Sequence, residues 1–112
     1  MTHSDMSARS AIDRVLLHDR DALEEVLLLR YEWLEEVAGK TIPVSLRERV
    51  SVEDVLEDSC VRIFRSFSSF SPQNGEAGLF QWLKLIVQSA ARDALRKVSS
   101  DQAIAPLGQS DP

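Results

Sequence analysis

The sequence has little cysteine, proline and glycine, with one Cys, four Pro and four Gly among 112 residues. A single cysteine, Cys60, excludes an intrachain disulfide, and His3 and His18 lack the second cysteine that would complete a zinc site. Because helix-breaking residues are few, helices can run long. We therefore predict an all-α chain with no disulfide, no metal and no cofactor.

The sequence also lacks a long apolar run. The apolar residues 26–29 are preceded by Glu24 and Glu25 and followed by Arg30, which leaves them far short of the roughly 18 residues that a membrane span needs. Residues 1–10 carry no basic stretch followed by an apolar segment, the pattern of a secretory signal. We predict no membrane segment and a cytoplasmic location.

Positive charge is scarce, since the formal net charge is −5. Residues 21–36 hold six acids and one base, whereas residues 80–97 hold four bases and one acid. This asymmetry suits a protein with two partners of opposite charge, and solvated helix faces explain it equally well. Nucleic-acid binding, which depends on Lys and Arg, would have to use the later segment.

Apolar residues recur at steps of three and four along four segments, which predicts a compact bundle of about four helices. The first helix is expected over residues 8–18 with Ser7 as N-cap, and the second over 21–38 with Gly39 ending it. Residues 40–50 form a connector with room for one helical turn. The predicted organisation is an N-terminal tail (1–7), one helical domain (8–98) and a C-terminal tail or linker (99–112).

The third helix is the clearest feature. Ser51 and Asp54 resemble a capping box, and an apolar series follows from Val52 to Phe67. Cys60 falls within that series, so a small thiol packed in the core is favoured over a reactive nucleophile.

A loop is expected over residues 66–78, which are rich in Ser and contain Pro72. The fourth helix is expected over 79–98, with Leu83 and Val87 among its inward residues and Lys84, Gln88, Arg92 and Arg96 outward.

Three strings in these segments resemble region 2 of the sigma-70 family of RNA polymerase sigma factors, in its short extracytoplasmic-function branch. Residues 54–65 (DVLEDSCVRIFR) are similar to that family's second conserved subregion. Residues 80–83 (FQWL) and 93–97 (DALRK) are similar to its promoter-reading helix, and residues 19–25 followed by Tyr31 resemble its opening helix.

The resemblance, which covers about residues 8–97, implies the fold of the region 2 domain and two partners. One is the clamp of the largest subunit of core RNA polymerase, and the other is the non-template strand of the minus-ten promoter element. The residues expected to bind polymerase are Asp54, Glu57, Asp58, Arg62 and Arg65. The residues expected to bind DNA are Phe70, Trp82, Lys84, Gln88, Ser89, Arg92 and Arg96.

Each role has a simpler alternative. The acids of the third helix could be a solvated face whose position near the helix N-terminus suits the helix dipole. Trp82 could be a core anchor between helices as readily as a base contact. The chain also departs from the family, because Gln81, Gln88 and Ser89 stand where cations or Arg-Asn are common, and residues 66–81 contain no Lys or Arg.

The sequence therefore predicts a domain that binds core polymerase and helps to recognise and melt the minus-ten element. The alternative is an interaction module of the same fold that binds polymerase or an anti-sigma factor without DNA recognition of its own. A third hypothesis, a small hydrolase, lacks a set of catalytic residues, since His18 and Cys60 lie on separate predicted helices and no partner that would orient them is recognisable in the sequence. We predict that the chain is not an enzyme.

Overall fold

The computed structural model describes the backbone of residues 3–71 and 73–110 and the side chains of residues 8–71 and 73–99. Within these residues the chain is all-helical and contains no strand, which confirms the predicted fold class. The elements are α1 (His3–Val15), α2 (Arg20–Leu29), α3 (Tyr31–Thr41), η1 (Val44–Leu46), α4 (Val52–Ser66), η2 (Phe67–Ser69) and α5 (Gly75–Ser110).

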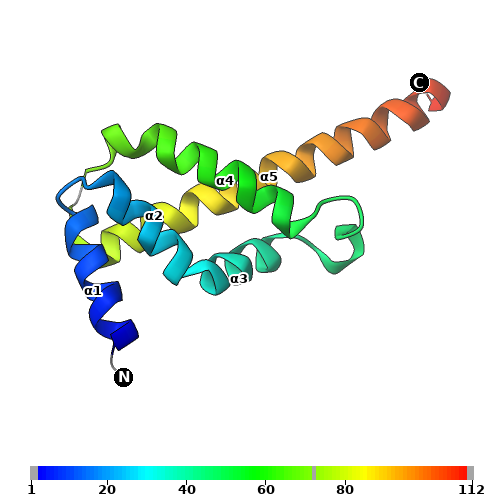
Figure 1. Ribbon diagram of the computed structural model, residues 1–112. Coiled ribbons are helices and arrows are strands. Elements are labelled where there is room, and N and C mark those ends of the chain that lie inside the picture. Colours follow the sequence, from blue (N-terminus) through cyan, green and yellow to red (C-terminus); the bar gives the residue numbers. More distant parts are fainter. Residues whose placement is uncertain (1–2, 72, 111–112) are drawn as a thin grey trace.

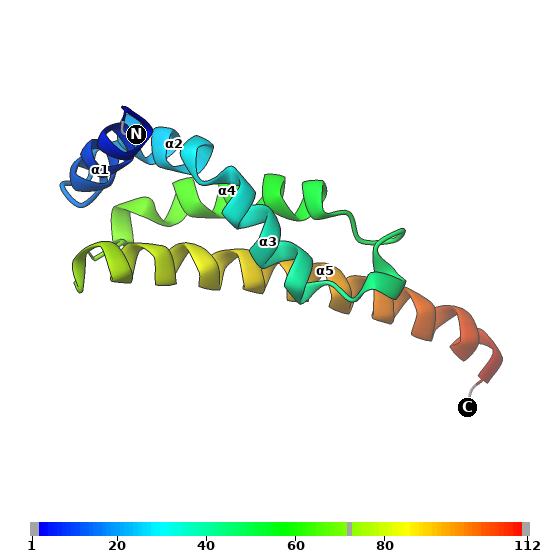
Figure 2. The same cartoon turned by 90° about the horizontal axis from the view of Figure 1, so that it is seen from below.

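The helices pack as two antiparallel long elements, α4 and α5, with the shorter helices laid against them (Figure 1). In Figure 2, α3 crosses over both long helices, and α1 packs against α2 at one end of the molecule. Fully buried residues from each layer, such as Leu23, Ile63 and Leu83, belong to one continuous core. The edge-to-face contact between the rings of Trp33 and Phe80, with centroids 5.3 Å apart, ties α3 to α5.

The segment expected as one helix over 21–38 is two helices, so that prediction is wrong. The chain bends at Arg30, whose φ of −113° and ψ of 22° leave the helical region. The Arg30 N–H still donates to Val26 at 2.9 Å and the Arg30 carbonyl accepts from Leu34 at 3.0 Å. The bend lets α2 pack on α1 while α3 packs on α4 and α5.

Helix ends also differ from the predictions. Gly39 lies inside α3, which ends only where Ile42 turns extended before Pro43 (φ −96°, ψ 117°), the conformation that a following proline favours. The predicted N-cap Ser7 lies inside α1, which ends at Val15. His18 does not extend that helix, because its φ is 64°.

The later elements follow the predictions more closely. The connector over 40–50 contains the one-turn η1, and α4 begins after Ser51 as expected. α5 starts at Gly75, earlier than predicted, and runs on as helix to Ser110 through most of the segment expected as a tail. Figure 1 shows this last part of α5 projecting away from the other helices.

Candidate interaction site on α4 and α5

The polar face of α4 is fixed at its start by a side-chain cap. The Ser51 hydroxyl accepts a hydrogen bond from the Asp54 N–H at 3.1 Å, which satisfies one of the helix's unpaired donors. Val55, Leu56 and Ile63 then point into the core. The opposite face is exposed and carries most of the residues that the sequence singled out for polymerase binding, namely Asp54, Glu57, Asp58 and Arg65.

Arg62, also expected on that face, is turned toward α5. Its Nε forms an ion pair with the Asp58 carboxylate at 2.9 Å, and its guanidinium forms a second with the Asp93 carboxylate at 3.0 Å. Asp93 is also paired with Arg96 one turn along α5. Four side chains from two helices thus form one ion-pair network, and its members are between about a third and three quarters exposed. Arg62 is therefore engaged within the fold and is not simply free to bind a partner.

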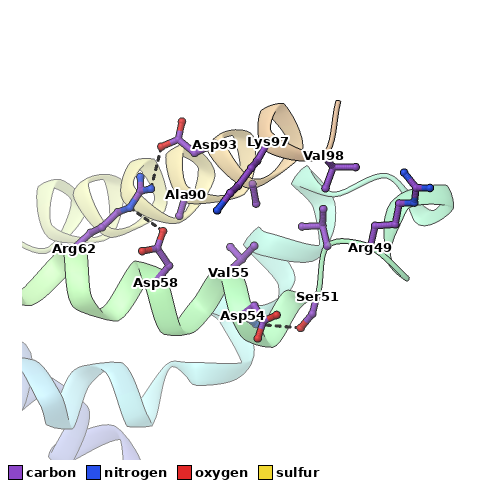
Figure 3. A pocket seen from close by; sticks show the side chains of 12 residues that line it. Arg49, Ser51, Asp54, Val55, Asp58, Arg62, Ala90, Asp93, Lys97 and Val98 are labelled. Carbon is purple, nitrogen blue, oxygen red and sulfur yellow. Dashed lines mark hydrogen bonds and ion pairs between the residues drawn. The ribbon is translucent and has the colours of Figure 1, made fainter. Parts of the chain in front are cut away.

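A groove of about 600 Å³ runs between α4 and α5 beside this network. Figure 3 shows Asp54 and Asp58 on the α4 side and Lys97 reaching in from α5. Val50, Val55 and Ala90 are buried and form part of its apolar lining. An apolar floor between charged rims of opposite sign is a surface that suits a protein or peptide partner.

The outward face of α5 carries the predicted DNA-binding cations. Lys84, Arg92 and Arg96 are exposed, with Ser89 exposed and Gln88 half-buried between them. Leu85 is 51% exposed on the same face. Apart from Asp93, which is paired with two arginines, residues 81–97 contain no acid. This face is therefore the most cationic part of the helix.

Of the two aromatic residues expected to contact bases, Phe70 is buried and Trp82 is partly buried. Phe70 is 6% exposed, and its ring centroid is 4.6 Å from that of Trp82, which is itself packed against the core. Phe67 lies beside both rings, 6.2 Å from Phe70 and 6.4 Å from Trp82. Trp82 thus takes the place of a core anchor, and Phe70 is covered in this conformation rather than presented to a base.

His18, which lies 52 residues before Phe70 in the chain, contacts this aromatic cluster. Its Nε2 donates to the Phe70 carbonyl at 2.8 Å, and its ring lies 5.3 Å from Phe67. His18 reaches this position from a left-handed backbone conformation with φ 64°, which is uncommon for a residue other than glycine. No local sequence pattern predicts this contact, because His18 and Phe70 are 52 residues apart in the chain.

Cys60 is half-buried and packed against the core rather than fully enclosed. Partial burial raises the pKa of its thiol above the ordinary value, and the Glu57 carboxylate raises it further. A raised pKa disfavours the reactive thiolate. The structure thus supports the interpretation of Cys60 as a packed thiol.

Two further features bear on the earlier predictions. Among the described residues, no three His, Cys, Asp or Glu side chains lie together in a way that could hold a metal ion. None of the helices formed by the described residues has the length and hydropathy of a membrane span.

Sequence reasoning missed several residues that the fold brings to the site. Asp93 joins α5 to Arg62, and Arg49 and Lys97 lie at the groove. Val61 is 48% exposed in the middle of the polar face of α4. Its position four residues after Glu57 and four before Arg65 places Val61 on the polar face, and this spacing could have identified it from the sequence.

No family model, no curated protein and no solved structure matches this chain. We therefore infer its function from the residues of the site and from the motifs that they resemble.

Proposed function

We propose that this chain is a transcription-initiation module of the sigma-70 region 2 type, which docks on the clamp of the largest subunit of core RNA polymerase through α4. The observation that carries the proposal is the exposed row of Asp54, Glu57 and Asp58, which are spaced by three and four residues. Such spacing places the carboxylates side by side along one helix face.

The surroundings of this row support docking over a merely solvated face. Val61 adds an exposed apolar side chain further along the same face, and Arg65 follows it. Protein interfaces commonly combine an apolar centre with charged residues around it. Among the side chains that the structure describes, Asp54 and Glu57 make no ion pair, so both carboxylates can meet cations of a partner.

Promoter DNA is proposed as the second partner, through the outward face of α5. Lys84, Arg92 and Arg96 are presented to solvent along that helix and suit contacts with phosphates. Since Phe70 is buried and Trp82 packs against it, base capture by Phe70 would require this aromatic cluster to open, whereas phosphate contacts would not.

The competing function is an interaction module of the same fold that binds polymerase, or an anti-sigma factor, without recognising DNA. Two observations favour it. The rings of Phe70 and Trp82 pack against each other, tilted by 34° with centroids 4.6 Å apart, and residues 66–81 contribute no cation.

Docking is tested by measuring the affinity of the purified chain for core RNA polymerase. The double variant Asp54→Lys/Asp58→Lys should weaken binding by at least about tenfold, because it places like charges opposite the partner's cations. The matched control is Asp21→Lys/Glu24→Lys, which makes the same change of charge at exposed positions in the first turns of α2. Equal affinity of the two variants, with helicity intact, would refute docking through α4.

DNA engagement is tested with a fluorescent base analogue placed in a minus-ten element. If the chain captures the strand, adding it together with core polymerase at low salt should unstack the base and raise the fluorescence. Arg92→Ala should reduce that signal, because it removes an exposed cation of α5. A lack of unstacking, with polymerase binding preserved, would leave the interaction module as the function.

A further inference from the structure

A second depression flanks α4 on the side away from the α4–α5 groove. It has a volume of about 270 Å³ and is lined by Tyr31 from the start of α3 and by Glu53, Leu56, Glu57 and Cys60 from α4. None of the ion pairs of the α4–α5 network reaches it. We call this depression the Tyr31 hollow.

The walls of the Tyr31 hollow are apolar. Leu56 is 3% exposed and forms part of the buried core, whereas Tyr31 is 39% exposed and leaves part of its ring open to solvent. Cys60 adds a half-buried thiol whose raised pKa, caused by burial and then by Glu57, keeps it neutral at physiological pH. The aliphatic stem of a long side chain could therefore lie in the hollow in contact with apolar atoms.

The rim of the hollow is negative. Glu53 and Glu57 are exposed one helical turn apart. The pKa of Tyr31 is raised, first by partial burial and then by the negative charge of Glu35, Glu53, Cys60 and Glu57, three of which are carboxylates. In the part of the chain whose side chains are described, none of these three carboxylates has a cationic partner within ion-pair distance.

We propose that the Tyr31 hollow receives one arginine side chain of the protein that docks on α4. The stem would lie against Leu56 and Cys60, and the guanidinium would stack on the Tyr31 ring between Glu53 and Glu57. Arginine fits better than lysine, because its planar, weakly hydrated head both stacks on aromatic rings and bridges carboxylates. This inference rests on the proposed docking function and specifies the chemistry of its partner.

The first test fills the hollow without changing charge. Cys60→Leu adds bulk where the arginine stem would lie, and should weaken binding to core RNA polymerase by about tenfold. Cys60→Ala leaves the space open and should weaken binding far less than Cys60→Leu does. Thermal unfolding of both variants identifies any loss of affinity that comes from misfolding.

The second test removes the negative rim. Glu53→Gln/Glu57→Gln should weaken binding by about fivefold to tenfold and reduce its dependence on salt. The matched control is Glu32→Gln/Glu36→Gln, which neutralises two exposed acids with the same spacing on α3, outside the residues that line the hollow. This control should leave the affinity unchanged.

A direct readout uses the single cysteine of the chain. An occupied hollow should protect Cys60 from alkylation by N-ethylmaleimide, measured on its peptide by mass spectrometry with and without core polymerase. Wild-type affinity of Cys60→Leu, together with an unchanged alkylation rate in the complex, would overturn the role of the hollow and leave docking through α4 standing. Failure of the wild-type chain to bind core polymerase would overturn both proposals.

Discussion

The exposed faces of α4 and α5 carry opposite charge, although the two helices pack side by side on one core. α4 presents Asp54, Glu57 and Asp58, whereas α5 presents Lys84, Arg92 and Arg96. The two sets meet at the seam between the helices, where Arg62 is paired with both Asp58 and Asp93. A net charge of −5 thus conceals two separate surfaces, each of which can attract a partner that the other would repel.

The charged and the aromatic residues of α5 also differ in how far they are exposed to solvent. On α5 the cations face solvent, while Trp82 of the same helix packs in the aromatic cluster. If the cluster is structural, Trp82→Ala should lower the free energy of unfolding by about 2 kcal/mol, since it removes a large packed ring. Urea denaturation measures this loss. DNA affinity per folded molecule should not change, and a drop in affinity at wild-type stability would return Trp82 to a base-contacting role.

The next largest effect should come from the cationic face. Replacing Lys84, Arg92 and Arg96 by Gln should weaken binding of a single-stranded oligonucleotide by about tenfold at low salt, and lower the salt slope by about 2. Fluorescence anisotropy at several salt concentrations measures both quantities. The triple variant Arg9→Gln/Lys40→Gln/Arg47→Gln makes the same change of net charge at residues that do not belong to α5 and should retain most of the affinity. Equal losses in the two variants would mean that α5 presents no particular DNA surface.

The start of α4 can be weakened without touching its acids. Ser51→Ala removes the hydroxyl that accepts from the Asp54 N–H and should cost about 1 kcal/mol of unfolding free energy. Ser51→Thr keeps a capping oxygen and should recover most of that loss. Chemical denaturation of both variants provides the measurement, and a neutral Ser51→Ala would show that the N-terminal turn of α4 does not depend on its cap.

The Arg62–Asp93 ion pair between α4 and α5 should contribute less to the free energy of unfolding. A double-mutant cycle of Arg62→Gln and Asp93→Asn should give a coupling energy of about 0.5 kcal/mol, because both side chains are about a third exposed and solvent screens the pair. High salt should reduce this coupling. A coupling that salt leaves unchanged would argue that packing, and not charge, joins Arg62 to α5.

The smallest effect concerns pH. Because the pKa of Cys60 is raised in the folded state, the folded chain holds the thiol proton more tightly than the unfolded chain does. Its contribution to stability is complete below the ordinary thiol pKa and is lost as the pH rises through the raised value. The free energy of unfolding, measured from neutral to alkaline pH, should therefore fall more steeply for the wild type than for Cys60→Ala. Identical pH profiles would contradict the shift.

Local signals explain which parts of the fold could be predicted. The start of α4 follows from Ser51 and Asp54, and its buried face follows from apolar residues at helical spacing. The bend at Arg30 has no such signal, because neither Gly nor Pro stands there. It arises because α2 and α3 pack against different helices, which no local pattern of residues reveals.

The candidate site divides in the same way. The exposure of Asp54, Glu57 and Asp58 could be predicted, because it depends on the register of one helix. The role of Trp82 could not, because a core anchor and a base contact both call for an aromatic side chain. Its ring neighbours Phe67 and Phe70 favour the core anchor. His18 joins the same cluster through its contact with Phe70, which lies 52 residues away in the chain.

The continuity of α5 has a mechanical consequence. Gly75–Ser110 is one uninterrupted helix of 36 residues, about 54 Å long at 1.5 Å per residue. Because the helix is continuous, the orientation of its packed end also fixes the direction in which the side chains of its outer end point. One residue inserted near Ser99 would advance the outer end by about 1.5 Å and turn it by about 100°, whereas seven residues would nearly restore its original phase.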